Sequence, residues 1–397
     1  MARFVRLGDV ATSSYGFTAS ATAEDTGARF LRITDIVNGT PGSYDSTPFV
    51  ETGSADVSKF ELKRGDVVIA RTGATVGTTH WFTGWPEPVL FASYLVRFTP
   101  IADIVNSRFL GYVLRSSSWS EHVYAHAYAK SAQPNMSARA MAEYQFQLPP
   151  LAQQQKTAAV LGSLDDKIAA NNDVVSASNE LIRNLYRALP ASSRTLNEVA
   201  SLVKNNEQPH RFLPDKRLVG LEHFDPKSLW LPRSSEPETA TSAKTKFQAG
   251  DTLFGKLRPY FHKVAIAPFG GYCSTDILVL RAANPLYSPL VAAAANSDAV
   301  VQQAVNSSNG TRMPRAKWTD IEGCPIPDPD APATLEFIDF AATLIQDATA
   351  RLDENKALAK TRDELLPLLM SGKITVREAG QEAAAAGVQV PSEENEV

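Results

Sequence analysis

The sequence predicts an α+β protein made of two similar domains, each followed by a long helix. Three observations support this class. The same short motifs occur twice, about 180 residues apart, which is far too long for a solenoid or propeller unit. Short β-type runs alternate with Gly, Pro, Ser and Thr turns in both halves. Each half then ends in a long helical pattern, so we expect two duplicated α+β domains and two long helices that form an antiparallel coiled coil.

The repeat is clearest in two motifs. Arg6-Leu7-Gly8-Asp9-Val10-Ala11 in the first half corresponds to Thr195-Leu196-Asn197-Glu198-Val199-Ala200 in the second. Gly65-Asp66 and its following apolar run correspond to Gly250-Asp251 and theirs. The duplication predicts that the two halves perform the same task on two related targets.

Composition restricts the class of protein. The chain has 397 residues, of which 44% are hydrophobic and 21% charged, as in ordinary globular proteins. It contains neither a long apolar stretch nor an apolar leader, so we expect no membrane association and no export. Its two cysteines, Cys273 and Cys324, are too few for a disulfide framework or a four-cysteine zinc site, which predicts a cytoplasmic protein.

Charge is distributed unevenly along the chain. The net charge is −4, but five acids and no base follow Arg377. One segment of the second half is basic and contains a single acid, Asp251; its bases are Lys244, Lys246, Lys256, Arg258 and Lys263. Such a patch is typical of phosphate contact, and a solvated surface loop is the alternative.

Strand and helix patterns follow the same order in both domains. In the first, β-type runs at 30–33, 67–70 and 94–98 precede a helical pattern near 109–126. In the second, runs at 218–221, 252–254 and 277–280 precede a helical pattern near 286–305. The predicted divisions are a first domain at 1–148, a spacer helix at 149–190, a second domain at 191–329, a second spacer helix at 330–372 and a tail at 373–397. The tail is rich in Ala, Glu and Gln, which predicts disorder.

The two long helical patterns run from Leu151 to Leu189 and from Ala333 to Met370. Apolar residues recur at alternating steps of three and four over more than four heptads in each, which is the pattern of a coiled coil. Aligning the two helices pairs Asn171 with Asn355 at a core position. An Asn in such a core lowers stability but selects one register. We therefore predict that these two residues set the coiled-coil register.

Catalytic motifs are not evident in the sequence. Gly73-Ala74-Thr75-Val76-Gly77-Thr78 lacks the lysine of a phosphate-binding loop. Asn284-Pro285-Leu286-Tyr287 matches three of the four positions of an amino-methyltransferase turn, but no Gly-rich cofactor loop accompanies it. His122 and His126 have the spacing of two metal ligands on a helix, without a third nearby. We predict neither catalytic residues nor a metal site.

Two divergent domains, two helical spacers and the absence of catalytic motifs resemble the specificity subunit of type I restriction–modification systems. The motifs that carry the resemblance are Leu148–Gln154, which leads into the first helix, Leu365–Ile374, which ends the second, and Gly65–Gly73 and Ser131–Ser137 in the first domain. The second domain departs from these motifs, with Gly255-Lys256-Leu257-Arg258-Pro259 and Asn309–Pro314 in the corresponding places.

The resemblance implies a function without chemistry of its own. Each domain would be a target-recognition domain that reads one half of a split double-stranded DNA sequence. The helices would bind two methyltransferase subunits and set the half-site separation, and nuclease–translocase subunits would join for cleavage. S-adenosylmethionine, ATP and Mg²⁺ would be bound by these partner subunits, so this chain is expected to hold no cofactor.

Base reading requires Arg or Lys opposite guanine and Asn or Gln opposite adenine, carried on loops of a rigid domain. The predicted DNA-binding residues of the first domain are Arg71, Thr72, Lys130, Gln133 and Asn135. Those of the second are Lys256, Arg258, Tyr260, Lys263, Asn309, Thr311 and Arg312. We expect the lysines to hold phosphates and the Arg, Asn and Gln residues to read bases. The alternatives are a self-sufficient DNA methyltransferase and a coiled-coil scaffold whose domains do not bind DNA.

Overall fold

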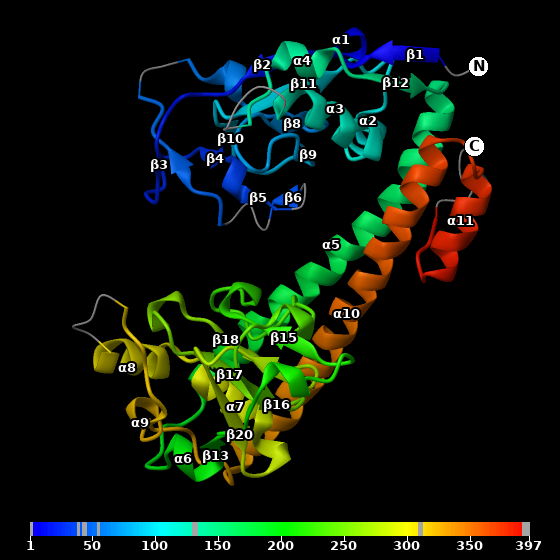
Figure 1. Cartoon of the computed structure of the whole chain (residues 1–397). Helices are drawn as coiled ribbons and strands as arrows, with labels where there is room; N and C mark the ends of the chain where they lie inside the picture. The colour runs from blue at the N-terminus through cyan, green and yellow to red at the C-terminus, as the bar shows by residue number, and fades with distance from the viewer. Residues whose placement is uncertain are drawn as a thin grey trace. The chain divides into compact units, whose positions relative to one another are not determined.

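The computed structural model describes residues 3–37, 40–41, 46–53, 56–128, 134–308 and 313–390. The chain forms two compact units, the first containing Met1–Ile168 and Ala357–Val397 and the second Ala169–Lys356. Each long helix therefore contributes one part to each unit (Figure 1). Among the described residues, none of the helices is long and apolar enough to cross a membrane.

The first unit is built around a four-stranded antiparallel sheet with the order β2-β11-β8-β9. A second sheet has the order β10-β4-β7-β3, and β1 pairs with β12. The strands are β1 Arg3–Arg6, β2 Ala11–Tyr15, β3 Ala21–Thr22, β4 Arg29–Leu31, β5 Ile36–Val37, β6 Thr40–Pro41, β7 Phe49–Val50, β8 Val67–Ala70, β9 Thr79–Trp81, β10 Val89–Phe91, β11 Leu95–Pro100 and β12 Gln145–Leu148. The helices are α1 Leu7–Val10, α2 Ser107–Val113, α3 Ser117–Ala127, α4 Ala138–Ala142 and α11 Val376–Ala385.

The second unit repeats this plan. Its central sheet has the order β13-β20-β17-β18, in which each strand corresponds in turn to a strand of the first unit's sheet β2-β11-β8-β9. A second sheet has the order β14-β16-β19-β15. The strands are β13 Ala200–Leu202, β14 Asn206–Glu207, β15 Arg217–Val219, β16 Lys244–Phe247, β17 Thr252–Gly255, β18 Val264–Ile266, β19 Gly271–Cys273 and β20 Ile277–Ala282. The helices are α6 Leu196–Val199, α7 Ser288–Ala295, α8 Asp298–Ser308 and α9 Trp318–Ile321. The α+β class and the duplicated domains predicted from the sequence are confirmed.

The repeated Gly-Asp motif stabilises the same turn in both sheets. Gly65 and Gly250 have positive φ angles of 95° and 84°, which glycine adopts at little cost. Asp66 and Asp251 are buried, and each carboxylate accepts a hydrogen bond at 2.8 Å from the backbone N–H three residues earlier. The motif is therefore structural, and it fixes the turn that precedes the central strands β8 and β17.

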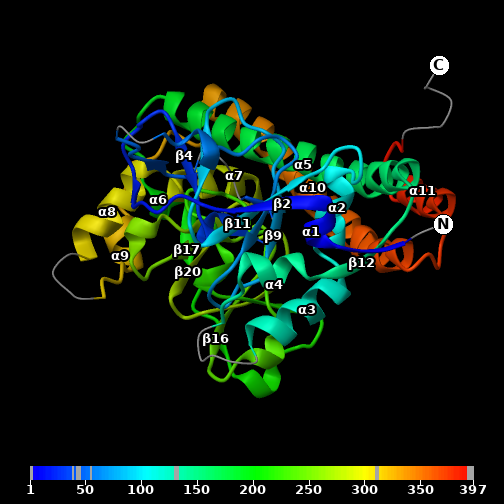
Figure 2. The ribbon, with the colours of Figure 1, turned by 90° about the horizontal axis from the view of Figure 1, so that it is seen from above.

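The long helices are α5, Leu151–Ala188, and α10, Pro332–Met370. They run side by side in Figures 1 and 2. In the second unit, Asn171 bonds to Asn355, and the rings of Tyr186 and Phe337 lie 5.9 Å apart. Residues later in α5 therefore contact residues earlier in α10. The pair is antiparallel, as the sequence predicted.

The entry to α5 is tied to the first domain by a buried glutamine. Gln154 donates hydrogen bonds to the carbonyls of Pro149 and Ile104 and accepts one from the Asn106 N–H. In the same unit Asp165 accepts hydrogen bonds from Tyr112 and Arg362, both at 2.6 Å. Burial, followed by the Asp165 charge, raises the pKa of Tyr112, so its hydroxyl stays protonated and donates. These bonds hold the first domain against its part of the helix pair.

The expected disorder of the tail is wrong for Val376–Ala385, which form α11. Thr375 and Glu378 make a capping box at its first turn. Ala379 and Ala383 are fully buried in a cluster with Leu365 and Leu369 of α10. Because the helix is stabilised by contact with α10, its polar composition alone did not reveal it.

Asn171 and Asn355 meet in the second unit, where Asn171 is buried. Its amide donates to Asn355 at 2.9 Å and to Glu354 at 2.7 Å, and its carbonyl accepts from Arg351 at 3.1 Å. The structure thus brings together the two residues predicted to set the register.

Replacing Asn171 alone with Leu is expected to destabilise the second unit by roughly 1–3 kcal/mol, because Asn355, Glu354 and Arg351 each lose one hydrogen bond. The Asn171→Leu/Asn355→Leu double variant is expected to recover part of that loss, giving a coupling energy of about 0.5–3 kcal/mol. Urea unfolding of the two single variants and the double variant measures this cycle. Strictly additive losses would contradict a joint role of the two amides.

Candidate nucleic-acid interface

The strand β8 ends in a segment that is paired with the loop before α4. The Arg71 carbonyl accepts from the Met136 N–H at 2.8 Å, and the Gly73 N–H donates to the Pro134 carbonyl at 3.0 Å. Thr72 forms an antiparallel bridge with Asn135. Two motifs about sixty residues apart in the sequence therefore form one surface.

The second unit repeats this pairing bond for bond after β17. The Lys256 carbonyl accepts from the Ala316 N–H at 2.9 Å, and the Arg258 N–H donates to the Pro314 carbonyl at 2.8 Å. Leu257 forms a bridge with Arg315. Lys256 therefore occupies the position of Arg71, and Arg315 that of Asn135.

Three cations on these paired segments, Arg71, Lys256 and Arg258, form no ion pair within the part of the chain that the structure describes. The Arg71 guanidinium lies 4.7 Å from the Tyr15 ring, and its buried Nε has no hydrogen-bond partner among the described residues. Lys256 is half-buried and Arg258 exposed, and neither side chain is paired with any residue that the structure describes. Arg258 also has a left-handed backbone, with φ of 52°, which is unusual for a residue with a side chain. Positive groups without a carboxylate partner are suited to an anionic ligand.

The remaining predicted residues divide into three groups. Asn135 and Tyr260 are exposed, the latter by 54%, and Thr72 is half-buried beside Asn135. Lys263 is half-buried, and its ammonium donates to the Leu221 carbonyl at 2.8 Å, so it is less available to a ligand than Lys256. The other predicted residues, Lys130, Gln133, Asn309, Thr311 and Arg312, lie outside the described residues.

Sequence reasoning missed Arg315. The prediction aligned the second motif at Asn309–Pro314, whereas the structure matches Pro314 with Pro134 and so extends the motif by two residues. The shared proline was the signal that could have found it. Arg315 pairs with Asp276 at 3.0 Å, so it differs from Arg71 and Lys256 in having an acidic partner.

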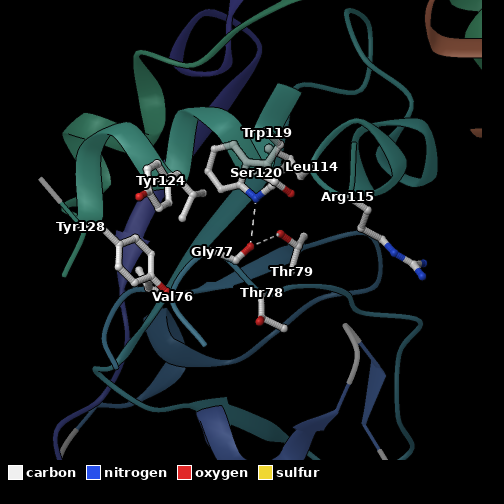
Figure 3. A pocket seen from close by; sticks show the side chains of 11 residues that line it. Val76, Gly77, Thr78, Thr79, Leu114, Arg115, Trp119, Ser120, Tyr124 and Tyr128 are labelled. Carbon is white, nitrogen blue, oxygen red and sulfur yellow. Dashed lines mark hydrogen bonds between the residues drawn. The ribbon is translucent and has the colours of Figure 1, made fainter. Parts of the chain in front are cut away.

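A hollow of about 560 Å³ lies beside the β8–β9 turn in the first unit. It lies between that turn and helix α3 (Figure 3). Trp119 is buried and donates through its indole N–H to the Gly77 carbonyl at 2.9 Å. Tyr124 and Tyr128, which are exposed by 72% and 41%, stack with ring centroids 5.6 Å apart. The hollow thus combines a rigid tryptophan with exposed aromatic rings close to the Arg71 segment.

Gly77 is required where Trp119 contacts the turn. Its φ is 87°, and an added Cβ would lie 2.7 Å from the Val123 side chain. A side chain at this position would therefore separate α3 from the turn.

Residues that suggested catalysis have structural partners. The Asn284 side chain caps the 3₁₀ turn Pro285–Tyr287 by accepting from the Leu286 N–H, and the Tyr287 hydroxyl donates to Asp330. His122 contacts the Ala140 carbonyl through Nε2, and burial lowers its pKa. Among the described residues, no three His, Cys, Asp or Glu side chains gather as a metal site requires.

Comparison with known proteins finds a match in the first part of the chain. The sequence profile of the type I restriction modification DNA specificity domain matches residues 2–176, which is less than half of the chain. The matched residues contain the paired segments around Thr72 and Asn135, the hollow beside α3 and most of α5.

Two known proteins resemble the chain over different lengths. The specificity subunit of the type I restriction enzyme EcoDI from Escherichia coli is 27% identical over 166 residues, which cover 39% of this chain and 37% of that relative. The match therefore spans little more than a third of the relative's length. The S subunit of a type I restriction–modification system from M. genitalium has a similar fold, with a TM-score of 0.54 and 13% identity, over 93% of this chain and 96% of that one. The likeness in fold thus extends beyond the specificity domain into the second unit.

Proposed function

We propose that this chain is the non-catalytic sequence-specificity subunit of a type I restriction–modification complex. Its two domains each read one half of a split double-stranded DNA target. The observation that carries the proposal is the equivalent placement of two cations, Arg71 and Lys256, at the ends of the central strands, where neither forms an ion pair with any described residue. The specificity domain at residues 2–176 supports it independently.

Recognition follows from the chemistry of the two surfaces. A planar guanidinium such as that of Arg71 matches the two acceptors of guanine in the major groove. The compact ammonium of Lys256 is suited to a phosphate, which positions the protein without reading sequence. Asn135 adds an amide that matches adenine. The two domains therefore present different side chains from the same framework, which allows two unlike half-sites.

Partners supply the chemistry in this proposal. Two methyltransferase subunits bind along the helices α5 and α10 and carry S-adenosylmethionine, and nuclease–translocase subunits with ATP and Mg²⁺ join for cleavage. The relative from E. coli, which matches this chain over 166 residues, is itself a specificity subunit of a type I restriction enzyme. The chain recognises the DNA sequence, and its partners modify or cut the DNA.

The test begins with the DNA target. Mapping methylated bases in cells with and without this protein yields the sequence, and the assembled complex is then titrated with that duplex. Arg71→Ala is expected to weaken binding by about ten- to a hundredfold and to relax the preference at one base pair of one half-site. Lys256→Ala is expected to weaken binding to all sequences and to reduce the salt slope by about one.

Arg6→Ala is the matched control. Arg6 is exposed and pairs with Asp9 at 3.1 Å, so its loss removes the same charge from the same domain without touching the proposed surface. If Arg6→Ala and Arg71→Ala weakened DNA binding equally and left the same sequence preference, the surface around Arg71 would not recognise the DNA sequence. Loss of the protein without any change in the methylation map would contradict the proposed function as a whole.

A further inference from the structure

The turn between β17 and β18 is built like the turn between β8 and β9 in the first unit. Its residues Lys256–Lys263 correspond one for one to Arg71–Thr78. The strand residue before each turn, Gly255 or Ala70, donates through its N–H at 2.8 Å to the carbonyl of the last turn residue. Side chains at equivalent positions of the two turns can therefore be compared directly.

The second turn carries side chains where the first has glycines. Gly73 and Gly77 have φ angles of 81° and 87°, and their counterparts Arg258 and His262 have φ angles of 52° and 51°. This left-handed conformation is costly for a residue with a side chain, and such strain is concentrated at functional sites. The strained backbone marks the second turn as a candidate contact with a ligand.

The base of the second turn is fixed to its domain. The His262 ring is buried, and its Nε2 lies 2.9 Å from the Asn296 carbonyl oxygen and 2.8 Å from the side-chain oxygen of the same residue. The Phe261 N–H donates to the Arg258 carbonyl at 2.9 Å, and Pro259, which follows Arg258, has a restricted φ angle. These contacts hold the turn in one conformation before any ligand binds.

Two aromatic side chains project from this fixed turn. Tyr260 and Phe261, here called the aromatic pair, are exposed by 54% and 45%, and their ring centroids lie 4.8 Å apart. The counterpart of Phe261 in the first turn is Val76, which is buried in the core of the first unit. The second turn thus presents flat apolar rings where the first buries an aliphatic side chain.

Positive charge adjoins the aromatic pair. Lys256 and Arg258 lie on the same turn, and neither forms an ion pair with any residue that the structure describes. The Lys263 ammonium lies 5.9 Å from the centroid of the Phe261 ring. An apolar protein surface would bury these cations without partners, which is costly. A nucleic acid offers phosphates to the cations and the flat faces of its bases to the rings.

We propose that the aromatic pair inserts beside one base step of the half-site that the second domain reads, unstacking that step and kinking the duplex there. The inference rests on the proposed function and deepens it. An inserted ring must overcome the stacking of the step, which is weakest at flexible pyrimidine–purine steps. The second domain therefore selects a deformable step as well as individual bases, and Phe261 joins Tyr260 as a specificity-determining residue.

The assembled complex and its mapped DNA target test this proposal. Donor and acceptor dyes flank one half-site in one duplex and the other half-site in a second duplex, so that energy transfer reports a kink in each. We expect binding to raise the energy transfer across the half-site of the second domain. At saturating protein, Tyr260→Ala/Phe261→Ala should reduce that rise. The double variant is also expected to bind about five- to a hundredfold more weakly, because it loses stacking on a base.

Two further variants serve as controls. Tyr260→Phe keeps the ring and removes only the hydroxyl, so it should retain both the affinity and the kink. Leu213→Ala removes an apolar side chain that is 48% exposed in the same unit but lies outside the turn. It should leave both measurements unchanged.

Three results would overturn the proposal. The first is a double variant with the affinity and energy transfer of the wild type. The second is weaker binding with unchanged energy transfer, because the rings would then contact the DNA without inserting. The third is loss of subunit assembly on size-exclusion chromatography, which would assign the rings to a protein partner. Failure of the proposed function is distinct from all three, since the wild-type complex itself would then show no preference for the mapped duplex.

Discussion

Replacing Asp251 with Ala is expected to lower the free energy of unfolding of the second unit by about 3 kcal/mol. The carboxylate is buried and accepts three hydrogen bonds, from the Gln248 N–H at 2.8 Å and from Arg281 Nε and Nη2 at 2.8 and 2.7 Å. Its loss removes the cap of the turn before β17 and leaves a cation on β20 without its partner. Both strands belong to the central sheet, so the whole unit depends on this residue.

Cys273 reports the opening of this unit. It is buried in β19, and burial raises the pKa of its thiol to about 12, so it reacts with an alkylating reagent only when the unit opens. We expect its alkylation to become more than about a hundredfold faster in Asp251→Ala, in line with the loss of stability. Asp251→Asn is the control, because it keeps an acceptor for the Gln248 N–H and should lie between the two. An unchanged alkylation rate in Asp251→Ala would show that the turn does not need its cap.

Replacing Trp119 with Ala is expected to destabilise the first unit by about 3–5 kcal/mol, as for other buried aromatic residues. Trp119 is exposed by only 2%, packs edge-on against Tyr144 and bonds to the Gly77 carbonyl. It joins α3 to the β8–β9 turn, which leads back to the Arg71 segment. We therefore expect the variant to lose DNA affinity through its first domain as well as stability.

Trp119→Phe separates the two contributions. It keeps most of the apolar volume and loses the indole hydrogen bond, so its stability should fall by roughly 1–2 kcal/mol. Circular dichroism during urea unfolding measures stability, and titration with the methylated target measures affinity. If Trp119→Ala lost stability but kept full affinity and sequence preference, the turn beside α3 would have no part in positioning Arg71.

The repeat and the helix pair could be predicted because their signals are local and periodic. Steps of three and four along α5 and α10 require a coiled coil, and Asn171 and Asn355 were found by aligning the two helices. The Gly-Asp motif was found in the same way, although its role in capping the turn became evident only with its hydrogen bonds. Among the site residues, Arg71 follows a predicted apolar strand directly and Lys256 follows one after Gly255, and these positions allowed both to be predicted from the sequence.

Arg315, Lys263 and α11 could not be judged from sequence, because each depends on contacts with distant segments. Arg315 takes the place of Asn135 through pairing across about sixty residues. Lys263 donates a hydrogen bond to the carbonyl of Leu221, some forty residues earlier in the chain. Helix α11 has a polar composition and gains its stability by burying two alanines against α10.

The amino-acid sequence by itself determined that this protein has two related halves and two paired helices, because repeated motifs and heptad spacing are local patterns that can be recognised within continuous segments of the sequence. The tertiary structure alone decided which loops meet beside β8 and β17 and which cations form no ion pair with the described residues. These outcomes depend on contacts between segments far apart in sequence, whose burial and hydrogen bonding no local pattern specifies.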